Sequence, residues 1–398
     1  MKGTAPSIVI ASLFLSMFAF AFTALPAKAL SGIIYISPNG SISSPVPANI
    51  TTHDKVTYTF TGNNYLPIVV NRSNIIIDGK HHTLQVSGND GFYLSSVDEV
   101  TIKNTIITNS LYGIYLWNSS FNNLSGNDIT GNWVGIDLEI NSDTNILSGN
   151  HVAANRGNGI YLDNSNFTTL SGNNITANAV GVWLEGSDSR FNSLLANNIK
   201  ANGVGIYLNG VRINFLYNNS ITTNSVGIYL HSSADNLICH NNFSNNTQQT
   251  SILSSSYNNW DNEYPVALYT FFPTGGNYWN DYKTRYPNAT QIDSSSIWNT
   301  PYVIDANNTD HYPLMSPVKA SKEPPLTWFV PVLIIIVVAA GSTLLAVILY
   351  GKKRTSLARA AQLGSPAGEG SSSFSQRGTK NRYSAPNALA HGHFGANP

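Results

Sequence analysis

This chain of 398 residues has very little cysteine and no excess of positive charge. Cys239 is the only cysteine, so no internal disulfide holds the fold together. Lys and Arg together number 21, as do Asp and Glu, which gives a formal net charge of zero. Residues 31–325 carry 12 basic against 20 acidic side chains, so this region lacks the excess positive charge typical of nucleic-acid binding. The composition therefore argues against nucleic acid as a partner.

Sustained helical periodicity is also missing from the central region, and a repeat takes its place. Seven times between residues 91 and 230, a glycine is followed by an apolar residue, a variable residue and leucine. These glycines recur at intervals of 22 to 24 residues, at Gly91, Gly113, Gly135, Gly159, Gly181, Gly205 and Gly227. A fixed period of this length indicates one structural unit stacked on copies of itself.

A series of asparagines recurs in phase with the glycines. Its members are Asn127, Asn150, Asn173, Asn197, Asn219 and Asn241. Apolar residues precede and follow each one at fixed distances, with Asn, Gly and Ser between them, which is typical of short strands and turns. Stacked units about 4.8 Å apart bury the apolar side that a single unit leaves exposed. We therefore predict a parallel β-helix with asparagine ladders at its corners and the repeat glycines where positive φ or close packing is needed.

The repeat resembles the right-handed parallel β-helix repeats of NosD-like, carbohydrate-binding and sugar-hydrolase proteins, over about residues 31–315. Three segments also resemble the archaeal NosD-like arrangement: NIIIDGKHHTL at 74–84, GGNYWNDY at 275–282 and TPYVIDANNTDHYPLM at 300–315. The resemblance implies an all-β, right-handed parallel β-helix. It also implies an extracytoplasmic, copper-linked accessory role in the maturation of nitrous oxide reductase.

The two ends of the chain predict a membrane protein. Residues 1–29 have the basic start, apolar run and small-residue cleavage site of a signal peptide. Residues 328–350 form an uncharged apolar stretch long enough to span a bilayer, and three basic residues follow it directly. We therefore expect a single-pass type I protein in the cell membrane, with the β-helix extracytoplasmic. The tail, residues 351–398, is expected to be cytoplasmic and disordered.

Between these ends we predict four regions. They are an N-terminal cap at 30–72, β-helix repeats at 73–256, a C-terminal cap module at 257–316 and a linker at 317–327.

Strand alternation assigns the variable residue of each repeat to the outside of the β-helix. We call this set of positions the outer column: Tyr93, Tyr115, Asp137, Tyr161, Trp183, Tyr207 and Tyr229. The second column, two residues further along each strand, consists of Ser95, Trp117, Glu139, Asp163, Glu185, Asn209 and His231. Aromatic rings offer flat platforms for sugar rings, and carboxylates accept hydrogen bonds from hydroxyls or hold Ca²⁺. Stacked aromatic residues also stabilise a solenoid without binding anything, so both interpretations remain open.

Catalysis is a further alternative for the same face. Glu139 with Asp163, or Glu139 with Glu185, would approach the carboxylate spacings of glycosidases. Any stacked carboxylates have such spacings, however. The sequence lacks the paired Asp-Asp and Gly-His-Gly of β-helix pectin hydrolases and the Asp-Pro-His-Glu of mannuronan epimerases. The pattern favours a binding protein over an enzyme of the glycoside hydrolase type.

Metal binding has little support in the sequence. Copper prefers Cys, Met or His ligands, and His231, Cys239 and His240 are the one grouping of this kind, although a polar turn explains them too. Cys239 aligns with outward-facing Ser125 and Ser171, which predicts an accessible thiol. The residues that suggest a Ca²⁺ loop or a capping turn are Asp305, Asn307, Thr309 and Asp310. The cofactor, Ca²⁺ or copper or none, stays undecided.

Overall fold

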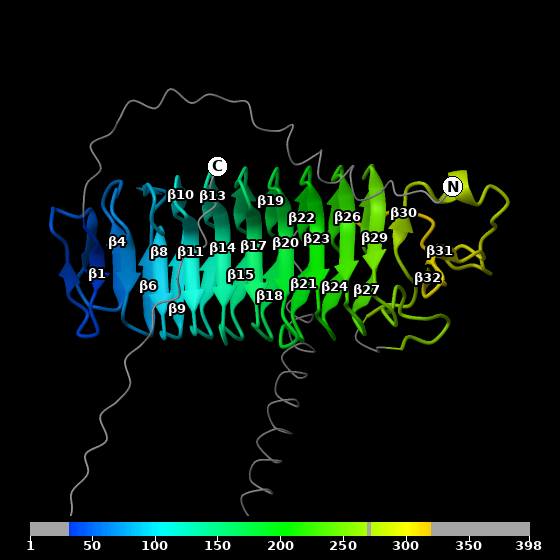
Figure 1. Ribbon diagram of the computed structural model, residues 1–398, viewed down its shortest axis with the longest axis horizontal. Helices are drawn as coiled ribbons and strands as arrows, with labels where there is room; N and C mark the ends of the chain where they lie inside the picture. The colour runs from blue at the N-terminus through cyan, green and yellow to red at the C-terminus, as the bar shows by residue number, and fades with distance from the viewer. Residues whose placement is uncertain (1–31, 269–271, 320–398) are drawn as a thin grey trace, which may run out of the picture. The chain divides into compact units, whose positions relative to one another are not determined.

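Successive windings of the chain stack into a parallel β-solenoid (Figure 1). The computed structural model describes residues 32–268 and 272–319. We call each winding a coil; a typical coil contributes one strand to each of three sheets, which contain 11, 10 and 9 strands. The predicted all-β parallel β-helix is therefore confirmed for this part of the chain.

The strands of each sheet follow one another along the stack. Sheet 1 contains β2 (Ile42–Ser43), β1 (Ile34–Ile36), β5 (Ile68–Val70), β8 (Phe92–Ser95), β11 (Tyr112–Trp117), β14 (Val134–Glu139), β17 (Asn158–Asp163), β20 (Val180–Glu185), β23 (Val204–Asn209), β26 (Val226–His231) and β29 (Gln248–Leu253). Sheet 2 contains β3 (Ile50–Thr52), β4 (Thr57–Phe60), β6 (Ile75–Asp78), β9 (Val100–Lys103), β12 (Asn123–Ser125), β15 (Ile146–Ser148), β18 (Thr169–Ser171), β21 (Ser193–Leu195), β24 (Phe215–Tyr217) and β27 (Leu237–Cys239). Sheet 3 contains β7 (Thr83–Gln85), β10 (Ile106–Thr108), β13 (Asp128–Thr130), β16 (His151–Ala153), β19 (Asn174–Thr176), β22 (Asn198–Lys200), β25 (Ser220–Thr222), β28 (Asn242–Ser244) and β30 (Tyr278–Trp279).

The core consists of like-on-like apolar ladders. In sheet 1, Leu116, Leu138 and Leu162 pair in register and are fully buried. Leu147 of sheet 2 and Ile129 of sheet 3 are buried in the same way and close the core from the other two sides. Burial of each such side chain stabilises the fold by about 1.5–3 kcal/mol. The inward positions of the repeat are therefore those predicted.

Buried asparagines form hydrogen-bonded ladders at the corners of the coils. Asn173 is typical: its Nδ2 donates to the Leu147 carbonyl at 2.8 Å and to Asn197 Oδ1 at 2.9 Å. The predicted ladder is thus confirmed, and two more that the sequence analysis missed lie at other corners. One of these contains Asn132, Asn155, Asn178, Asn202, Asn224 and Asn246, and the other Asn122, Asn145, Asn192, Asn214, Asn236 and Asn258.

The repeat glycines allow the coils to approach closely. A Cβ on Gly113 would lie 2.5 Å from the carbonyl oxygen of Gly135 and 2.8 Å from Ile129 Cγ2. None of the seven repeat glycines has a positive φ. Of the two predicted reasons for glycine, close packing is therefore right and positive φ is wrong.

A non-repeating module covers the C-terminal end of the core. Beyond β30 it contains α2 (Tyr282–Arg285) and the antiparallel hairpin of β31 (Tyr302–Asp305) and β32 (Asn308–Asp310). The Trp279 ring lies between those of Phe243 and Tyr302, with ring centroids 4.3 and 4.1 Å away. The fully buried Asp310 accepts hydrogen bonds from the Asn277 backbone N–H at 2.7 Å and from Trp279 Nε1 at 2.8 Å.

The segment suggested as a Ca²⁺ loop is this hairpin. Asp305 Oδ1 accepts a hydrogen bond from the Asn307 backbone N–H, and both carboxylate oxygens of Asp305 accept from Asn308 Nδ2. Since Asp310 is directed into the protein, these residues form a capping turn.

Several predictions fall outside the described residues. The signal peptide at 1–29, the membrane helix at 328–350 and the tail at 351–398 all lie there. Within residues 32–268 and 272–319, no helix combines the length and the apolar character needed to cross a membrane.

Candidate functional site on the outer face of sheet 1

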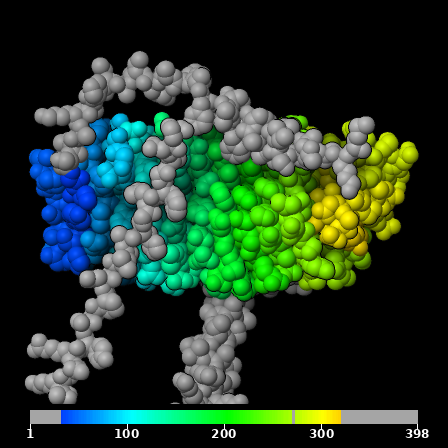
Figure 2. All heavy atoms as spheres, in the orientation of Figure 1, coloured from blue at the N-terminus to red at the C-terminus, as the bar shows by residue number. Residues whose placement is uncertain are grey.

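The outer face of sheet 1 carries the two predicted columns in the predicted register. Tyr115 pairs with Tyr93 on one side and Asp137 on the other, and the column continues through Tyr161 and Trp183. The second column pairs likewise, through Trp117, Glu139, Asp163, Glu185, Asn209 and His231. Successive coils form one continuous surface from the blue to the yellow end in Figure 2. The sequence therefore located these side chains correctly relative to one another.

Most rings of the outer column stack on one another. The Tyr207 and Tyr229 rings are 4.8 Å apart at 10°, and those of Tyr93 and Tyr115 are 5.5 Å apart at 26°. Stacking covers the face that each ring turns toward its partner. These pairs therefore have less flat ring surface available for a ligand than separate rings would have.

Tyr161 departs from the stacked arrangement. Its ring meets Trp183 edge-to-face, at 5.5 Å and 74°, and its other neighbour in the column is Asp137 instead of an aromatic residue. Its hydroxyl donates to Glu185 Oε2 at 2.8 Å, one coil further along. Burial, reinforced by the bonded Glu185, raises the pKa of Tyr161 well above its ordinary value. Tyr161 therefore joins the aromatic and acidic columns by a hydrogen bond.

Asp137 is buried although its position in the strand faces outward. Only 2% of its surface is exposed, and its Oδ1 atom has no hydrogen-bond partner. Burial, followed by repulsion from Glu139, Asp163 and Asp90, raises the pKa of Asp137 to about 8. The Asp137 side chain is therefore mostly protonated at neutral pH. The exposed carboxylate expected from the sequence is wrong for this residue.

Replacing Asp137 by asparagine is expected to stabilise the protein increasingly as pH rises. The folded protein holds the Asp137 proton up to about pH 8. An unfolded chain releases it near pH 4, so this group costs stability progressively between those values. Asparagine has no proton to release, and the gain should grow from near zero at pH 4 to a few kcal/mol, in order of magnitude, at pH 8. Urea unfolding at both pH values measures this gain.

The exposed Asp188 provides the control for that measurement. Asp188→Asn should leave the pH dependence of unfolding unchanged. An Asp137→Asn gain that is equal at pH 4 and pH 8 would contradict the buried, protonated state.

The carboxylates of the second column lie on three consecutive coils. Glu139, Asp163 and Glu185 pair in register. Asp163 Oδ1 accepts from Asn164 Nδ2, and Glu185 Oε1 accepts from Asn209 Nδ2, both at 2.8 Å. Burial, with repulsion from Glu185 and Glu139, raises the pKa of Asp163. Within the described ranges, no Lys, Arg or His forms an ion pair with any of the three.

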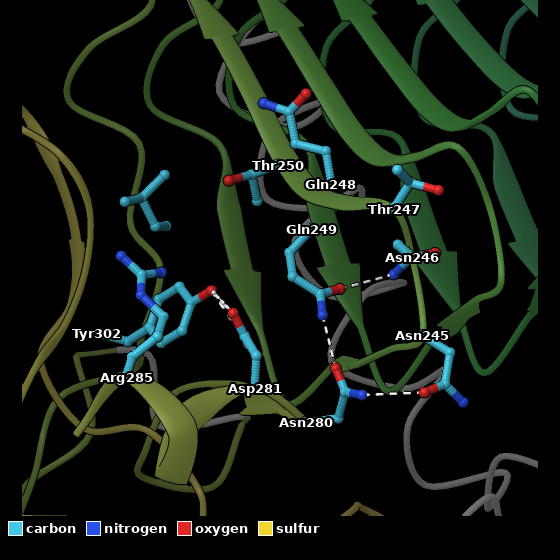
Figure 3. A pocket seen from close by; sticks show the side chains of 11 residues that line it. Asn245, Asn246, Thr247, Gln248, Gln249, Thr250, Asn280, Asp281, Arg285 and Tyr302 are labelled. Atoms are coloured by element: carbon cyan, nitrogen blue, oxygen red, sulfur yellow. Dashed lines mark hydrogen bonds between the residues drawn. The ribbon is translucent and has the colours of Figure 1, made fainter. Parts of the chain in front are cut away.

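A polar hollow that the sequence did not predict lies between β29 and the C-terminal module (Figure 3). Its volume is about 430 Å³. A chain of side-chain amides crosses it, because Asn246 donates to Gln249, Gln249 to Asn280, and Asn280 to Asn245. The hollow joins the last coil to a non-repeating segment, so no repeat pattern marks it in the sequence. Its amides are largely bonded to each other, which favours the sheet 1 face as the candidate site.

The fold and the two columns define the class of this protein, a parallel β-helix with a long aromatic and acidic sheet face. The family model described as periplasmic copper-binding protein (NosD) matches residues 46–226 and 187–284, together more than half of the chain. The chain therefore belongs to the NosD family. No curated protein matches it.

Solved structures with a similar fold include proteins whose titles name a mannuronan epimerase, an alginate epimerase or an alginate lyase. The A-module of mannuronan C-5 epimerase AlgE6 from Azotobacter vinelandii has 15% identity and a TM-score of 0.43, and the match covers 49% of this chain and 60% of that one. The periplasmic alginate epimerase AlgG has 16% identity, a TM-score of 0.39 and coverages of 54% and 81%. An alginate lyase from Paenibacillus sp. has 13% identity, a TM-score of 0.29 and coverages of 50% and 89%. This chain thus spans about 60% of the AlgE6 module.

The described residues do not fit the copper that the family's description implies. His231 lies on β26 in sheet 1, whereas Cys239 lies on β27 in sheet 2. Cys239 is fully buried in an apolar cluster with Tyr217, against which Phe272 packs, and burial raises the pKa of its thiol well above the usual range. The accessible thiol predicted from the sequence is therefore wrong. Within residues 32–268 and 272–319, no three His, Cys, Asp or Glu side chains are placed to hold a metal ion.

Proposed function

We propose that this protein binds a glycan or a related envelope polymer, without catalysis, along the outer face of sheet 1. The observation that carries the proposal is the group around Tyr161, where a partly covered aromatic ring, the adjacent Trp183 and the carboxylates of Asp163 and Glu185 lie together. Sugars have both apolar ring faces and hydroxyl donors. The aromatic rings of this group can contact the ring faces, and its carboxylates can accept hydrogen bonds from the hydroxyls.

The hydrogen-bonding capacity of the face supports this proposal. Within the described residues, Glu139 Oε1 and Asp163 Oδ2 have no side-chain donor, and the hydroxyls of Tyr93, Tyr207 and Tyr229 have no protein partner. These groups can accept from, and donate to, the hydroxyls of a sugar. Because the columns run along consecutive coils at about 4.8 Å, they suit an extended polymer better than a compact ligand.

Substitution on this face tests the proposal. We expect replacement of Tyr161, Trp183 and Tyr207 by alanine to weaken glycan binding at least about tenfold, because three aromatic contacts are each worth roughly 0.5 kcal/mol or more. Tyr161→Phe alone removes only the hydroxyl bonded to Glu185 and should weaken binding about threefold with the fold intact. Titration of the full-length chain with the glycan, alongside circular dichroism, measures both effects.

A stacked pair away from this face gives the matched control. The Phe167 and Phe191 rings are 5.0 Å apart at 5°, outside sheet 1, and their replacement by alanine should leave binding unchanged. Two results together would refute this proposal. The first is that Tyr161→Phe binds the glycan as tightly as the wild type does. The second is that the Phe167 and Phe191 control loses as much binding as the triple variant.

One observation favours an enzymatic alternative. Asp137, whose pKa burial raises to about 8, lies two residues from the carboxyl group of Glu139, and general acid catalysis uses such a protonated carboxyl group. This alternative predicts release of reducing ends or unsaturated sugars from a polysaccharide. That release should be lost in Asp137→Asn, Glu139→Gln and Asp163→Asn.

We also propose that the β-helix lies outside the cytoplasm and is attached to the cell membrane through residues 328–350. The family's description as periplasmic supports the location, and the apolar stretch followed by basic residues supports the attachment. Protease added to intact cells should digest the β-helix and spare the tail.

A further inference from the structure

The second column concentrates negative charge that nothing in the described part of the chain neutralises. We call Glu139, Asp163 and Glu185 the acid column. Its members pair in register on β14, β17 and β20, so their backbones are about 4.8 Å apart from one coil to the next. Like charges on directly paired strand positions are destabilising. No cationic side chain within residues 32–268 and 272–319 lies within ion-pair distance of the acid column.

A buried carboxyl group beside the acid column is also without a partner. Asp137 lies two residues before Glu139 on β14, and its Oδ1 atom is inaccessible and accepts no hydrogen bond. Asp137 interacts electrostatically with Glu139 and Asp163. Buried polar atoms normally have a hydrogen-bond partner, and one without a partner destabilises the fold. The fold therefore maintains two unfavourable electrostatic features at the same place on the face.

The neighbouring groups favour an organic cation over a metal ion. Four of the six carboxylate oxygens already accept a hydrogen bond, because Tyr115 donates to Glu139, Asn164 to Asp163, and both Tyr161 and Asn209 to Glu185. The remaining oxygens, Glu139 Oε1 and Asp163 Oδ2, suit the three donors of an ammonium group. In the described ranges the acidic side chains do not converge as a metal ion requires.

We propose that the polymer bound by this face is an amino-sugar glycan with free ammonium groups, which interact with the acid column while its sugar rings contact Tyr161 and Trp183. This inference rests on the proposed glycan binding and names the class of glycan. The proposal rests on charge complementarity, because ammonium groups at Glu139 and Asp163 would offset the repulsion between coils. A uronic acid polymer would add negative charge to the same face and is excluded as a ligand.

Three hexamers distinguish the classes of glycan. They are glucosamine hexamer, its fully N-acetylated form and galacturonic acid hexamer, each titrated calorimetrically against the full-length chain at pH 6 and low salt. We expect the glucosamine hexamer to bind about tenfold more tightly than the acetylated form, and the galacturonic acid hexamer not to bind. Raising the salt concentration should reduce the preference for glucosamine, because exposed charges are screened.

Charge removal provides the decisive variant. In Glu139→Gln, Asp163→Asn and Glu185→Gln together, the preference for glucosamine should fall to about twofold or less, because binding of the glucosamine hexamer is reduced more than binding of the acetylated hexamer. The matched control removes three exposed carboxylates elsewhere, by Glu99→Gln, Asp188→Asn and Glu263→Gln, and should keep the full preference.

The outcomes separate this inference from the proposed function. Equal binding of the two glucosamine-based hexamers, or tighter binding of the galacturonic acid hexamer, overturns the cationic class and leaves glycan binding in place. Absence of binding by all three overturns both. Loss of preference in the control variant assigns the effect to net charge and overturns the role of the acid column.

Discussion

Asn197→Ala is expected to lower the free energy of unfolding by about 2–6 kcal/mol, although Asn197 lies far from any proposed ligand. Its Oδ1 accepts from the Asn173 backbone N–H at 3.0 Å, and its Nδ2 donates to the Leu170 carbonyl at 2.9 Å. Alanine leaves these two buried groups unsatisfied, at about 1–3 kcal/mol each. Because each coil contacts only its neighbours, the loss weakens the stack at that coil. Urea unfolding followed by circular dichroism measures the change.

The adjacent residue is a matched control for the ladder. Asn198 is exposed on β22, and its Nδ2 donates only to the side chain of Asn174. Asn198→Ala should change the free energy of unfolding by about 0.5 kcal/mol or less. Equal effects of the two substitutions would show that the buried ladder does not stabilise the fold as argued.

Gly276→Ala is expected to disrupt the C-terminal module. A Cβ at position 276 would overlap the carboxylate of Asp310, which is fully buried and held by hydrogen bonds from Asn277 and Trp279. Displacing Asp310 removes the acceptor of the Asn277 backbone N–H and of Trp279 Nε1, at a cost of about 3 kcal/mol or more. The change should be visible as loss of the near-ultraviolet circular dichroism of the packed Trp279 ring and as faster proteolysis of residues 257–316.

Gly149→Ala separates this collision from ordinary backbone strain. Gly149 has a φ of 61° and open space around its Cβ position, so alanine there should cost only about 1–2 kcal/mol and leave the C-terminal module intact. A Gly276→Ala protein as stable as Gly149→Ala, with its Trp279 signal preserved, would contradict the role assigned to Asp310.

The repeat predicted the fold because every coil needs apolar residues at the same inward positions, so the same pattern recurs in the sequence. Leu138 and Leu162 occupy the same inward position in successive coils, and each must be apolar for the stack to form. The ladder that contains Asn145 and Asn192 is harder to predict from the sequence, because Thr168 interrupts it between these two residues. A ladder tolerates one such change, since only the hydrogen bonds of the neighbouring coils are affected.

Burial was less predictable than register. The sequence placed Asp137 on the outer face correctly, yet whether an outward side chain reaches water depends on its neighbours from adjacent coils. The prediction of an accessible Cys239 thiol is wrong for another reason. Cys239 pairs with Tyr217, and Phe272 of the non-repeating module packs against the same cluster. A periodic pattern carries no information about contacts made by a segment outside the period.

Binding of a glycan by the outer face of sheet 1 is tested most directly by an array of purified oligosaccharides probed with the full-length wild-type chain and with the Tyr161, Trp183 and Tyr207 alanine variant. The array should include neutral, amino-sugar and uronic acid oligomers. The account predicts signal from the wild type that is strongest on glucosamine oligomers and lost in the variant. Absence of signal from the wild type on every oligosaccharide, or equal signals from both proteins, would contradict it.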